Sequence, residues 1–342
     1  MLKQTLAAAA AITMLSGAVQ AETLIMQSIY AGTLPLLGDT GKALGERVSL
    51  LTGGELEIEF NDPGAIVASN EIWDAVSTGA VDAGWYSPGF AQGIIPAAGL
   101  FTAVPFGPDV REYAAWWYHG GGMEEWNAIG ERFDIHSELC AVLVPEASGW
   151  FREPIETVED LQGLKMRIFG LGARVMQKLG VQAQSLPPAD TMTALRLGTI
   201  DSAEISFPAI DLNLEMNTYA NNYYFPGWHQ QTSLITFIVN KAVWDGLSDQ
   251  KRAVIEEVCA ANVTRTMARG ESMQLEPMAA LRDAGVAFHT WNPEMMDAFR
   301  GAWEEVAVEM SAEDEEFARV WKNFQDFRAQ YKEWGDLGYV KN

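Results

Sequence analysis

Arg167 is a single cation within the short apolar run 166–169. Turn-forming glycines stand on either side, at Gly163 and Gly170, so the arginine is predicted at the end of a short strand. A guanidinium in apolar surroundings needs an anion, and its planar fork matches the two oxygens of a carboxylate. These residue types indicate a carboxylate-binding site. The alternative is an internal ion pair with an Asp or Glu of the fold.

The segment after Arg167 has a characteristic order. It contains a helix-like stretch at 173–179, two prolines at 187–188 and the run ALRLGTIDSAE at 194–204. This order resembles the second lobe of the DctP-type periplasmic solute-binding proteins of TRAP transporters. The resemblance implies that Arg167 clamps the carboxylate of an organic acid.

The resemblance covers essentially the whole chain after residue 21 and is closest to the family branch that binds 2-oxo acids. It implies an α/β fold of the type II periplasmic binding protein class, with two hinged α/β lobes and C-terminal helices. The matching stretches are PGAIV at 63–67, DAVSTG at 74–79, VPFG at 104–107, the glycine-rich segment 111–122, GWFR at 149–152 and YYFPGWH at 223–229.

The order of predicted strands and helices gives the domain organisation. Strands and helices alternate from residue 23 onward, which is typical of an α/β lobe with a largely parallel sheet. We expect the chain to cross between lobes near residues 145 and 230. Lobe I is then 22–145 and 231–292, lobe II is 146–230, and the C-terminal helical segment is 293–342.

The N-terminus has the features of a secretion signal. Lys3 precedes an Ala-rich apolar stretch at 6–15, and Val19-Gln20-Ala21 suits cleavage before Glu22. The apolar stretch is too short to span a bilayer. We therefore predict a signal peptide at 1–21 and a periplasmic protein. A buried N-terminal helix is the alternative.

The composition restricts the partners. The formal net charge of −23 repels nucleic acid and anionic lipid, so neither is an expected partner. An anionic ligand must be attracted locally rather than by a general cationic field. Two cysteines, Cys140 in an apolar run and Cys259 in a helical run, leave a disulfide or two buried thiols open, and free thiols are favoured.

In the 2-oxo acid branch, a metal ion also holds the ligand. By resemblance, Glu146 stands where the family has Gln, Gln230 where it has Glu, and Ile205 supplies the backbone carbonyl at a position where the family often has Trp. Because the acid and the amide exchange places, the same oxygen inventory is retained for Na⁺ or Ca²⁺. The alternative is that the metal site is lost and Glu146 pairs with Arg167.

Further residues are candidates to line the ligand site. Ser206 and Phe207 follow Ile205, and Arg152 follows the GWF stretch, where it also suits a surface ion pair. Strand ends of an open α/β sheet are where ligands bind, and these strand ends carry the aromatic residues Tyr30, Trp85 and Tyr86. Core packing is the alternative role for each of the three.

We expect a binding protein and no enzyme, because no nucleophile elbow and no paired carboxylates stand in a cleft-like context. The predicted function is capture of an organic acid (a monocarboxylate, 2-oxo or 2-hydroxy acid) and its delivery to a TRAP permease. The rival is a secreted two-lobe enzyme acting on a small carboxylate. A sensor that docks on a chemoreceptor would use the same binding event.

The C-terminal segment carries more aromatic area than docking on one lobe requires, and large apolar surfaces usually mark an interface. We expect a homodimer through these helices, as the resemblance to the 2-oxo acid branch also implies. The alternative is an intramolecular brace behind both lobes. The aromatic residues concerned are Phe299, Trp303, Phe317, Trp321, Phe324, Phe327, Tyr331 and Trp334.

Overall fold

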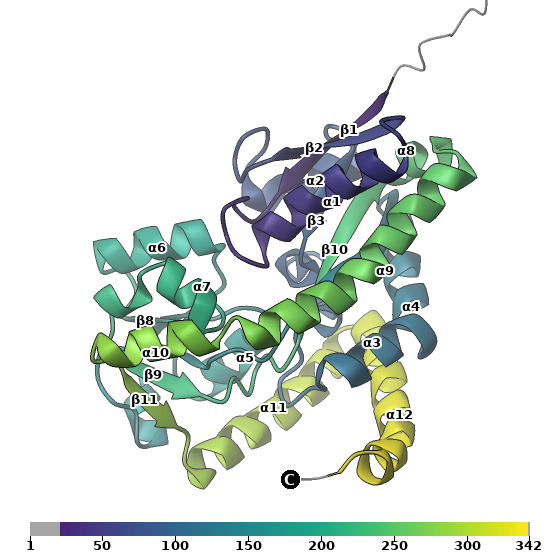
Figure 1. Ribbon diagram of the computed structural model, residues 1–342. Helices are drawn as coiled ribbons and strands as arrows, with labels where there is room; N and C mark the ends of the chain where they lie inside the picture. Colours follow the sequence, from purple (N-terminus) through teal and green to yellow (C-terminus); the bar gives the residue numbers. More distant parts are fainter. Residues whose placement is uncertain (1–20, 341–342) are drawn as a thin grey trace, which may run out of the picture.

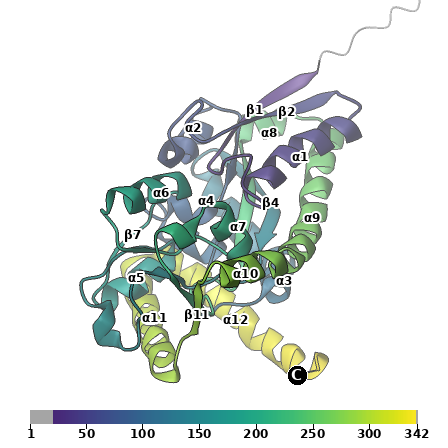
Figure 2. The ribbon, with the colours of Figure 1, turned by 60° about the vertical axis from the view of Figure 1, so that its left-hand side comes forward.

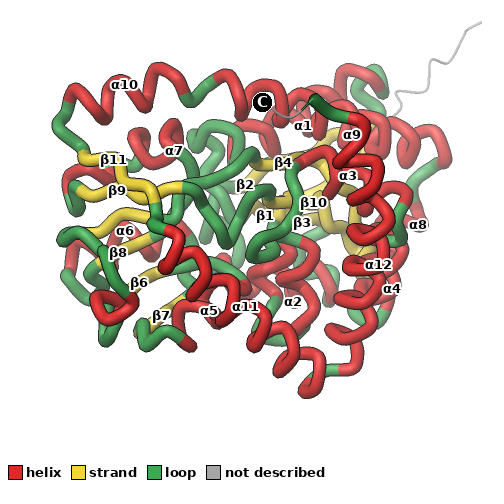
Figure 3. The backbone as a smooth tube through the Cα atoms, turned by 90° about the horizontal axis from the view of Figure 1, so that it is seen from below, coloured by secondary structure: helices red, strands yellow, loops and turns green. Residues whose placement is uncertain are grey.

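The computed structural model describes residues 21–340. Its strands form two sheets that lie next to each other with helices around them (Figure 1, Figure 3). This is the predicted two-lobe α/β architecture. The predicted signal peptide lies outside the described residues, apart from Ala21.

The sheet of lobe I has the strand order β2-β1-β3-β10-β4. Strand β1 runs parallel to β2 and β3, whereas β10 runs antiparallel to β3 and β4. The strand predicted at 235–240 therefore does return to the first sheet. The bounds are β1 (Glu22–Ser28), β2 (Leu56–Asn61), β3 (Ala83–Tyr86), β4 (Ile135–Leu143) and β10 (Ser233–Asn240).

The burial pattern of each strand follows its place in this sheet. Strand β10 reads SLITFIVN and is buried throughout, because it is covered on both faces. Strand β2 reads LEIEFN at the sheet edge, and its first residues alternate between buried and exposed. A two-residue period of this kind is typical of a strand with one wet face.

The sheet of lobe II has the strand order β11-β9-β5-β8-β6-β7. Strand β6 ends at Arg167, as predicted. The bounds are β5 (Gly149–Phe151), β6 (Lys165–Arg167), β7 (Gln182–Gln184), β8 (Ser202–Ala203), β9 (Asn222–Phe225) and β11 (Ala287–Thr290).

Strand β11 corrects one predicted boundary. The sequence assigned all of 231–292 to lobe I, but β11 pairs in parallel with β9 of lobe II. Helix α9 leads from lobe I toward lobe II, where α10 packs against α7 (Figure 1). The chain therefore crosses to lobe II again before the C-terminal helices begin.

Helices cover both sheets, and among the described residues none is long and apolar enough to cross a membrane. The bounds are α1 (Gly38–Leu51), α2 (Ile72–Ser77), α3 (Val110–His119), α4 (Gly122–Glu131), α5 (Leu171–Lys178), α6 (Pro188–Leu197), α7 (Pro208–Asn213), α8 (Lys241–Gly246), α9 (Asp249–Ser272), α10 (Leu275–Asp283), α11 (Pro293–Glu313) and α12 (Glu315–Gly338).

Cys140 of β4 and Cys259 of α9 form a disulfide. The favoured prediction of two free thiols is wrong. Helix α9 packs along β4 (Figure 2) and brings together two residues that are 119 positions apart in sequence. This contact depends on the tertiary fold, so the residues next to either cysteine do not predict it.

The C-terminal helices pack across both lobes. Helix α11 contacts α5 of lobe II, and Phe299 stacks on Trp228 with ring centroids 4.5 Å apart. Helix α12 contacts α3 and α4 of lobe I, where Asn323 accepts a 2.8 Å hydrogen bond from Trp116. Most of the aromatic area that suggested a dimer is therefore used within the chain. Asp314 separates the two helices and caps α12 by accepting from Phe317.

Candidate functional site

A small cavity lies between the two lobes at the end of β6. Its volume is about 20 Å³, which is about the space that one water needs. The lobes are therefore closed on one another around it. The lining residues are Tyr30, Leu37, Phe90, Leu143, Glu146, Arg167, Phe169, Pro188, Glu204, Ile205, Gln230 and Ser233.

Among residues 21–340, Arg167 is the only Lys or Arg that lines this cavity, and its side chain is almost fully buried, with 2% of the residue exposed. Its Nε donates to the carbonyl of Leu186 at 2.9 Å, and its Nη1 donates to Glu204, both to the backbone carbonyl and, at 2.8 Å, to Oε2. Its Nη2 makes no hydrogen bond to any described residue. The fold therefore holds the Nε and Nη1 groups of the guanidinium and leaves Nη2 without a hydrogen bond to the described residues.

Glu204 is the internal ion-pair partner that the alternative prediction allowed for Arg167. Strand pairing places Ala203 opposite Arg167, so Glu204 follows immediately beside it. Burial alone would raise the pKa of Glu204, but Arg167, with His229, lowers it to about 2. The carboxylate is therefore ionised, with His229 Nε2 at 3.6 Å from Oε1.

Glu146 lies in the connection between β4 and β5, one of the segments that join the lobes. Its backbone is hydrogen-bonded to the joining segment between β9 and β10: its N–H donates to Gln230, and its carbonyl accepts from Gly227. Ser206 donates to Glu146 Oε1 at 2.8 Å. Burial, and then the charge of Glu204, raises the pKa of Glu146 well above its usual range. Glu146 does not pair with Arg167.

Several buried polar atoms around the cavity have no hydrogen-bond partner among the described residues. They are Glu146 Oε2, Glu204 Oε1, Gln230 Oε1 and both ring nitrogens of His229. Each unsatisfied buried group costs about 1–3 kcal/mol of stability. Five such atoms in one place therefore favour a bound group that would satisfy them. Ligand atoms of Glu146, Glu204 and His229 lie within 4.8 Å of one another.

These atoms fit a hard cation. Two carboxylates and an amide oxygen are the donors that Ca²⁺ or Na⁺ takes in proteins. The predicted donors Glu146, Gln230 and Ile205 all line the cavity. The structure adds Glu204 and His229 to the sequence-based set.

Lobe I contributes neutral side chains to the cavity. Tyr30 is hydrogen-bonded through its hydroxyl to Ser87 at 2.8 Å, and burial raises its pKa, so the phenol stays protonated. Phe90 meets Phe169 of lobe II with ring centroids 4.4 Å apart. Of the lobe I candidates from the sequence, Tyr30 reaches the cavity.

Other predicted residues do not line the cavity. Arg152 is exposed on the loop after β5. Phe207 is fully buried at the start of α7, and Tyr86 is buried against Trp73 and Phe90. Trp85 is also core, because its Nε1 donates to the carbonyl of Leu37 at 2.7 Å. Ser206 does not line the cavity either, but it donates a hydrogen bond to Glu146, which does.

The residues at or beside the cavity that the prediction lacks include two aromatic ones, Phe90 and Phe169, and two ionisable ones, Glu204 and His229. Two of them stand in quoted stretches, Glu204 at the end of ALRLGTIDSAE and His229 directly before Gln230. Because both are polar and stand next to predicted ligand-binding residues, the sequence could have indicated them. The two phenylalanines could not be predicted, because an apolar residue in an apolar run is typical of a hydrophobic core.

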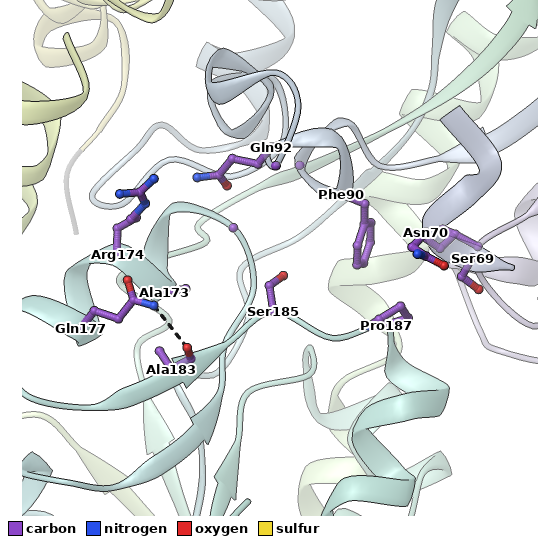
Figure 4. Close-up of a pocket in the computed structure, with 14 residues that line it drawn as sticks. Ser69, Asn70, Phe90, Gln92, Ala173, Arg174, Gln177, Ala183, Ser185 and Pro187 are labelled. Carbon is purple, nitrogen blue, oxygen red and sulfur yellow. Dashed lines mark hydrogen bonds between the residues drawn. The ribbon is translucent and has the colours of Figure 1, made fainter. Parts of the chain in front are cut away.

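A larger pocket opens on the outer side of Phe90. It has a volume of about 380 Å³ and is lined from both lobes. Figure 4 shows Arg174, Gln92 and Gln177 gathered at one end, with Asn70, Ser69 and Pro187 at the other. Phe90 lies between these ends and lines both this pocket and the inner cavity.

Comparison with known proteins gives the class of the chain. Residues 28–314 match the family model DctP, bacterial extracellular solute-binding protein, family 7. The chain belongs to this family, whose members bind solutes and are not enzymes. DctP-family proteins are periplasmic.

The similar proteins agree with one another. The monocarboxylate 2-oxoacid-binding periplasmic protein of Nostoc sp. (strain PCC 7120) is 31% identical over 86% of this chain and 80% of its own length. A TRAP transporter solute-binding protein of Bordetella bronchiseptica, described as a mixed-occupancy dimer with copurified calcium and picolinate, is 30% identical with a TM-score of 0.89 (92% and 94% covered). One of Pseudoalteromonas atlantica, with bound sodium and pyruvate, is 28% identical with a TM-score of 0.88 (92% and 96% covered).

The similarity also bears on the closure of the lobes. A solute-binding protein of Rhodobacter sphaeroides in an apo open structure is 25% identical, covers 92% of this chain and 99% of its own, and has a TM-score of only 0.66. The present chain therefore resembles the structures solved with pyruvate, at a TM-score of 0.88, more than it resembles this open one.

Proposed function

We propose that this chain is the extracytoplasmic receptor of a TRAP transporter. It binds a small organic acid between its lobes, with the acid's carboxylate on Arg167, and delivers it to the membrane permease. Acids of the pyruvate type, with a 2-oxo or 2-hydroxy group, are the proposed ligands, because one similar protein is named for 2-oxo acids and another was solved with pyruvate.

The observation that carries this proposal is the half-used guanidinium of Arg167. A buried arginine whose Nη2 lacks a partner offers a short, charge-assisted hydrogen bond to an incoming carboxylate. The sequence suggested that both Nη groups of Arg167 would be available to the ligand carboxylate, and this differs in one respect. Because Nη1 already donates to Glu204, the ligand carboxylate accepts its hydrogen bond from Nη2. The ligand and Glu204 thus share the guanidinium.

Charge balance favours a cation beside the acid. Arg167 and Glu204 neutralise each other, so a ligand carboxylate can bind beside Glu146 only if Glu146 stays protonated, which its raised pKa favours, or if a cation offsets the two carboxylates. A calcium or sodium ion on Glu146, Gln230 and the Ile205 carbonyl offsets them and bridges to the ligand. Glu204 and His229 stand close enough to support that ion.

A homodimer remains part of the proposal, through the end of α12. That end projects from the body of the molecule (Figure 2) and exposes Trp334 (58%) and Leu337 (80%), and Val340 (93%) follows just beyond it. Light scattering on the protein without residues 1–21 should give a mass near two chains at micromolar concentration. A mass near one chain contradicts the dimer.

The identity of the ligand is tested on freshly purified protein. Mass spectrometry of the released small molecules should reveal a carboxylic acid, and a thermal-shift screen of short acids should then select it. A ligand at 100 times its Kd stabilises the folded state by about 2.7 kcal/mol. Turnover of the acid during incubation would support the rival view of a secreted enzyme.

A further inference from the structure

Aromatic side chains divide the interlobe cleft into two spaces. The inner cavity of about 20 Å³ contains Arg167, and the outer pocket of about 380 Å³ opens to solvent. Phe90 lines both spaces. At three further places, one residue lines the outer pocket and its neighbour in sequence lines the inner cavity: Ile29 and Tyr30, Gly170 and Phe169, and Pro187 and Pro188.

The two spaces therefore lie back to back with one layer of side chains between them. Phe90 of lobe I and Phe169 of lobe II meet across this layer, with ring centroids 4.4 Å apart and planes at 45°. A ligand with a long chain can extend from the inner cavity in this direction only if the two rings separate.

The two halves of this aromatic contact differ in how firmly they are held. Phe169 is buried, its N–H donates to Glu204 Oε2 at 3.1 Å, and its ring centroid is 5.8 Å from the guanidinium carbon of Arg167. Phe90 is only partly buried and borders the outer pocket (Figure 4). Phe169 is thus a fixed wall, and Phe90 is the side that a longer ligand would displace.

We propose that the Phe90–Phe169 contact sets the upper limit on the chain length of the bound acid. This inference rests on the proposed function and specifies its substrate class: short-chain acids that leave the aromatic contact closed. An acid with a longer chain keeps the lobes from closing, because its tail must pass between the rings. The outer pocket then has room for that tail only when Phe90 is removed.

The test is a chain-length series measured by calorimetry in the presence of calcium: pyruvate, 2-oxobutyrate, 2-oxovalerate and 2-oxohexanoate. For the wild type, affinity should be highest for the short acids and should fall along the series. For Phe90→Ala, affinity should instead rise with length, by up to about fourfold for each methylene that becomes buried in the outer pocket.

Phe133→Ala is the matched control. Phe133 is also a partly buried lobe I phenylalanine with an aromatic contact, to Trp73 at 5.6 Å, but it lines neither space. This variant should reproduce the wild-type series. Phe90→Leu, which keeps an apolar side chain, should fall between the wild type and Phe90→Ala, and it serves if the alanine variant does not fold.

The outcomes separate the two claims. If the wild type binds pyruvate but the series has the same slope in wild type, Phe90→Leu and Phe90→Ala, the length limit is refuted and the proposed function stands. If the wild type binds no acid of the series, the proposed function fails, and this inference fails with it.

Discussion

The two lobes differ in what they bury. Among the described residues, every buried Asp, Glu, Lys or Arg lies in lobe II or in the segment joining it to lobe I: Glu146, Arg167, Glu204 and Asp211. Lobe I buries only neutral side chains. Its contribution to the inner cavity is correspondingly neutral and comes from Tyr30, Leu37, Phe90, Leu143 and Ser233.

This asymmetry suggests an order of events. Buried charges need compensation from fixed partners, and in lobe II those partners are in place through strand pairing and backbone hydrogen bonds. We therefore expect the acid and its cation to dock first on lobe II and the joining segments. Lobe I would then close over them and exclude water without adding charge.

The largest expected effect is at Arg167. Arg167→Ala should abolish acid binding, and it should also destabilise the protein by about 3–5 kcal/mol, because it leaves Glu204 as a buried unpaired charge. Chemical denaturation and calorimetry measure the two effects separately. Arg196→Ala, an exposed arginine on α6, should change neither. Near-normal affinity in folded Arg167→Ala would move the ligand site elsewhere.

Arg167→Lys separates charge from geometry. A lysine can keep the ion pair with Glu204 but has no second prong for a ligand. This variant should therefore recover much of the lost stability while binding the acid poorly. Tight binding by the lysine variant would show that a point charge suffices.

The second effect concerns Asp211, the buried carboxyl of lobe II that does not line the cavity. Its Oδ2 accepts from Trp150 and Tyr223, and burial raises its pKa to about 7. The folded state thus prefers the protonated form, so stability is greatest below the ordinary pKa of an aspartate and is lost as pH rises from about 4 to 7. At 1.36 kcal/mol per unit, the loss is about 4 kcal/mol.

Asp211→Asn should remove this component while keeping an acceptor for both donors. Urea denaturation of cation-free protein between pH 4 and 8 measures it: the wild-type free energy of unfolding should fall more steeply than that of the variant. Burial and Glu204 also raise the pKa of Glu146, so part of the slope should remain. Parallel curves would mean that Asp211 is ionised at little cost.

The third effect tests the cation. Glu146→Gln removes the one charge among the predicted donors, so affinity for the acid should fall by about tenfold or more and lose its dependence on calcium. The exchange of acid and amide offers a matched rescue: Glu146→Gln combined with Gln230→Glu restores the charge on the other joining segment. This double variant should regain calcium-dependent binding, and equal affinities in all three proteins would refute the cation.

The smallest effect is expected in lobe I. Tyr30→Phe keeps the ring at the cavity and removes only the hydroxyl bonded to Ser87. Acid affinity should change by about fivefold or less, in line with one neutral hydrogen bond. A loss as large as that of Arg167→Ala would break the distinction between a charged and a neutral lobe.

The sequence predicted the two-lobe α/β architecture because the hydrophobic periods and glycine turns of each element are local. It also placed Arg167 correctly at a strand end. It could not assign the partner of Arg167, because Glu204 becomes its neighbour only through the register of β6 and β8. The disulfide and the placement of β11 were missed for the same reason, since each depends on contacts between distant segments.

The C-terminal helices show the opposite limit. Aromatic residues such as Trp303, Phe317 and Phe324 correctly signalled a large buried surface, but composition cannot tell which surface they meet. In the structure they pack mainly against the chain's own lobes. The periodicity of a helix fixes which residues are buried and leaves the partner undetermined.

We expect lobe II and the joining segments to bind a short acid together with a cation. Calorimetric titration of the protein with pyruvate, with calcium and then with a chelator, tests it most directly. We predict binding with calcium, a loss of at least about tenfold in affinity with the chelator, and recovery when calcium is returned. Binding that is equally tight with and without the chelator would contradict the cation, and the absence of binding for every short acid would contradict the proposed function itself.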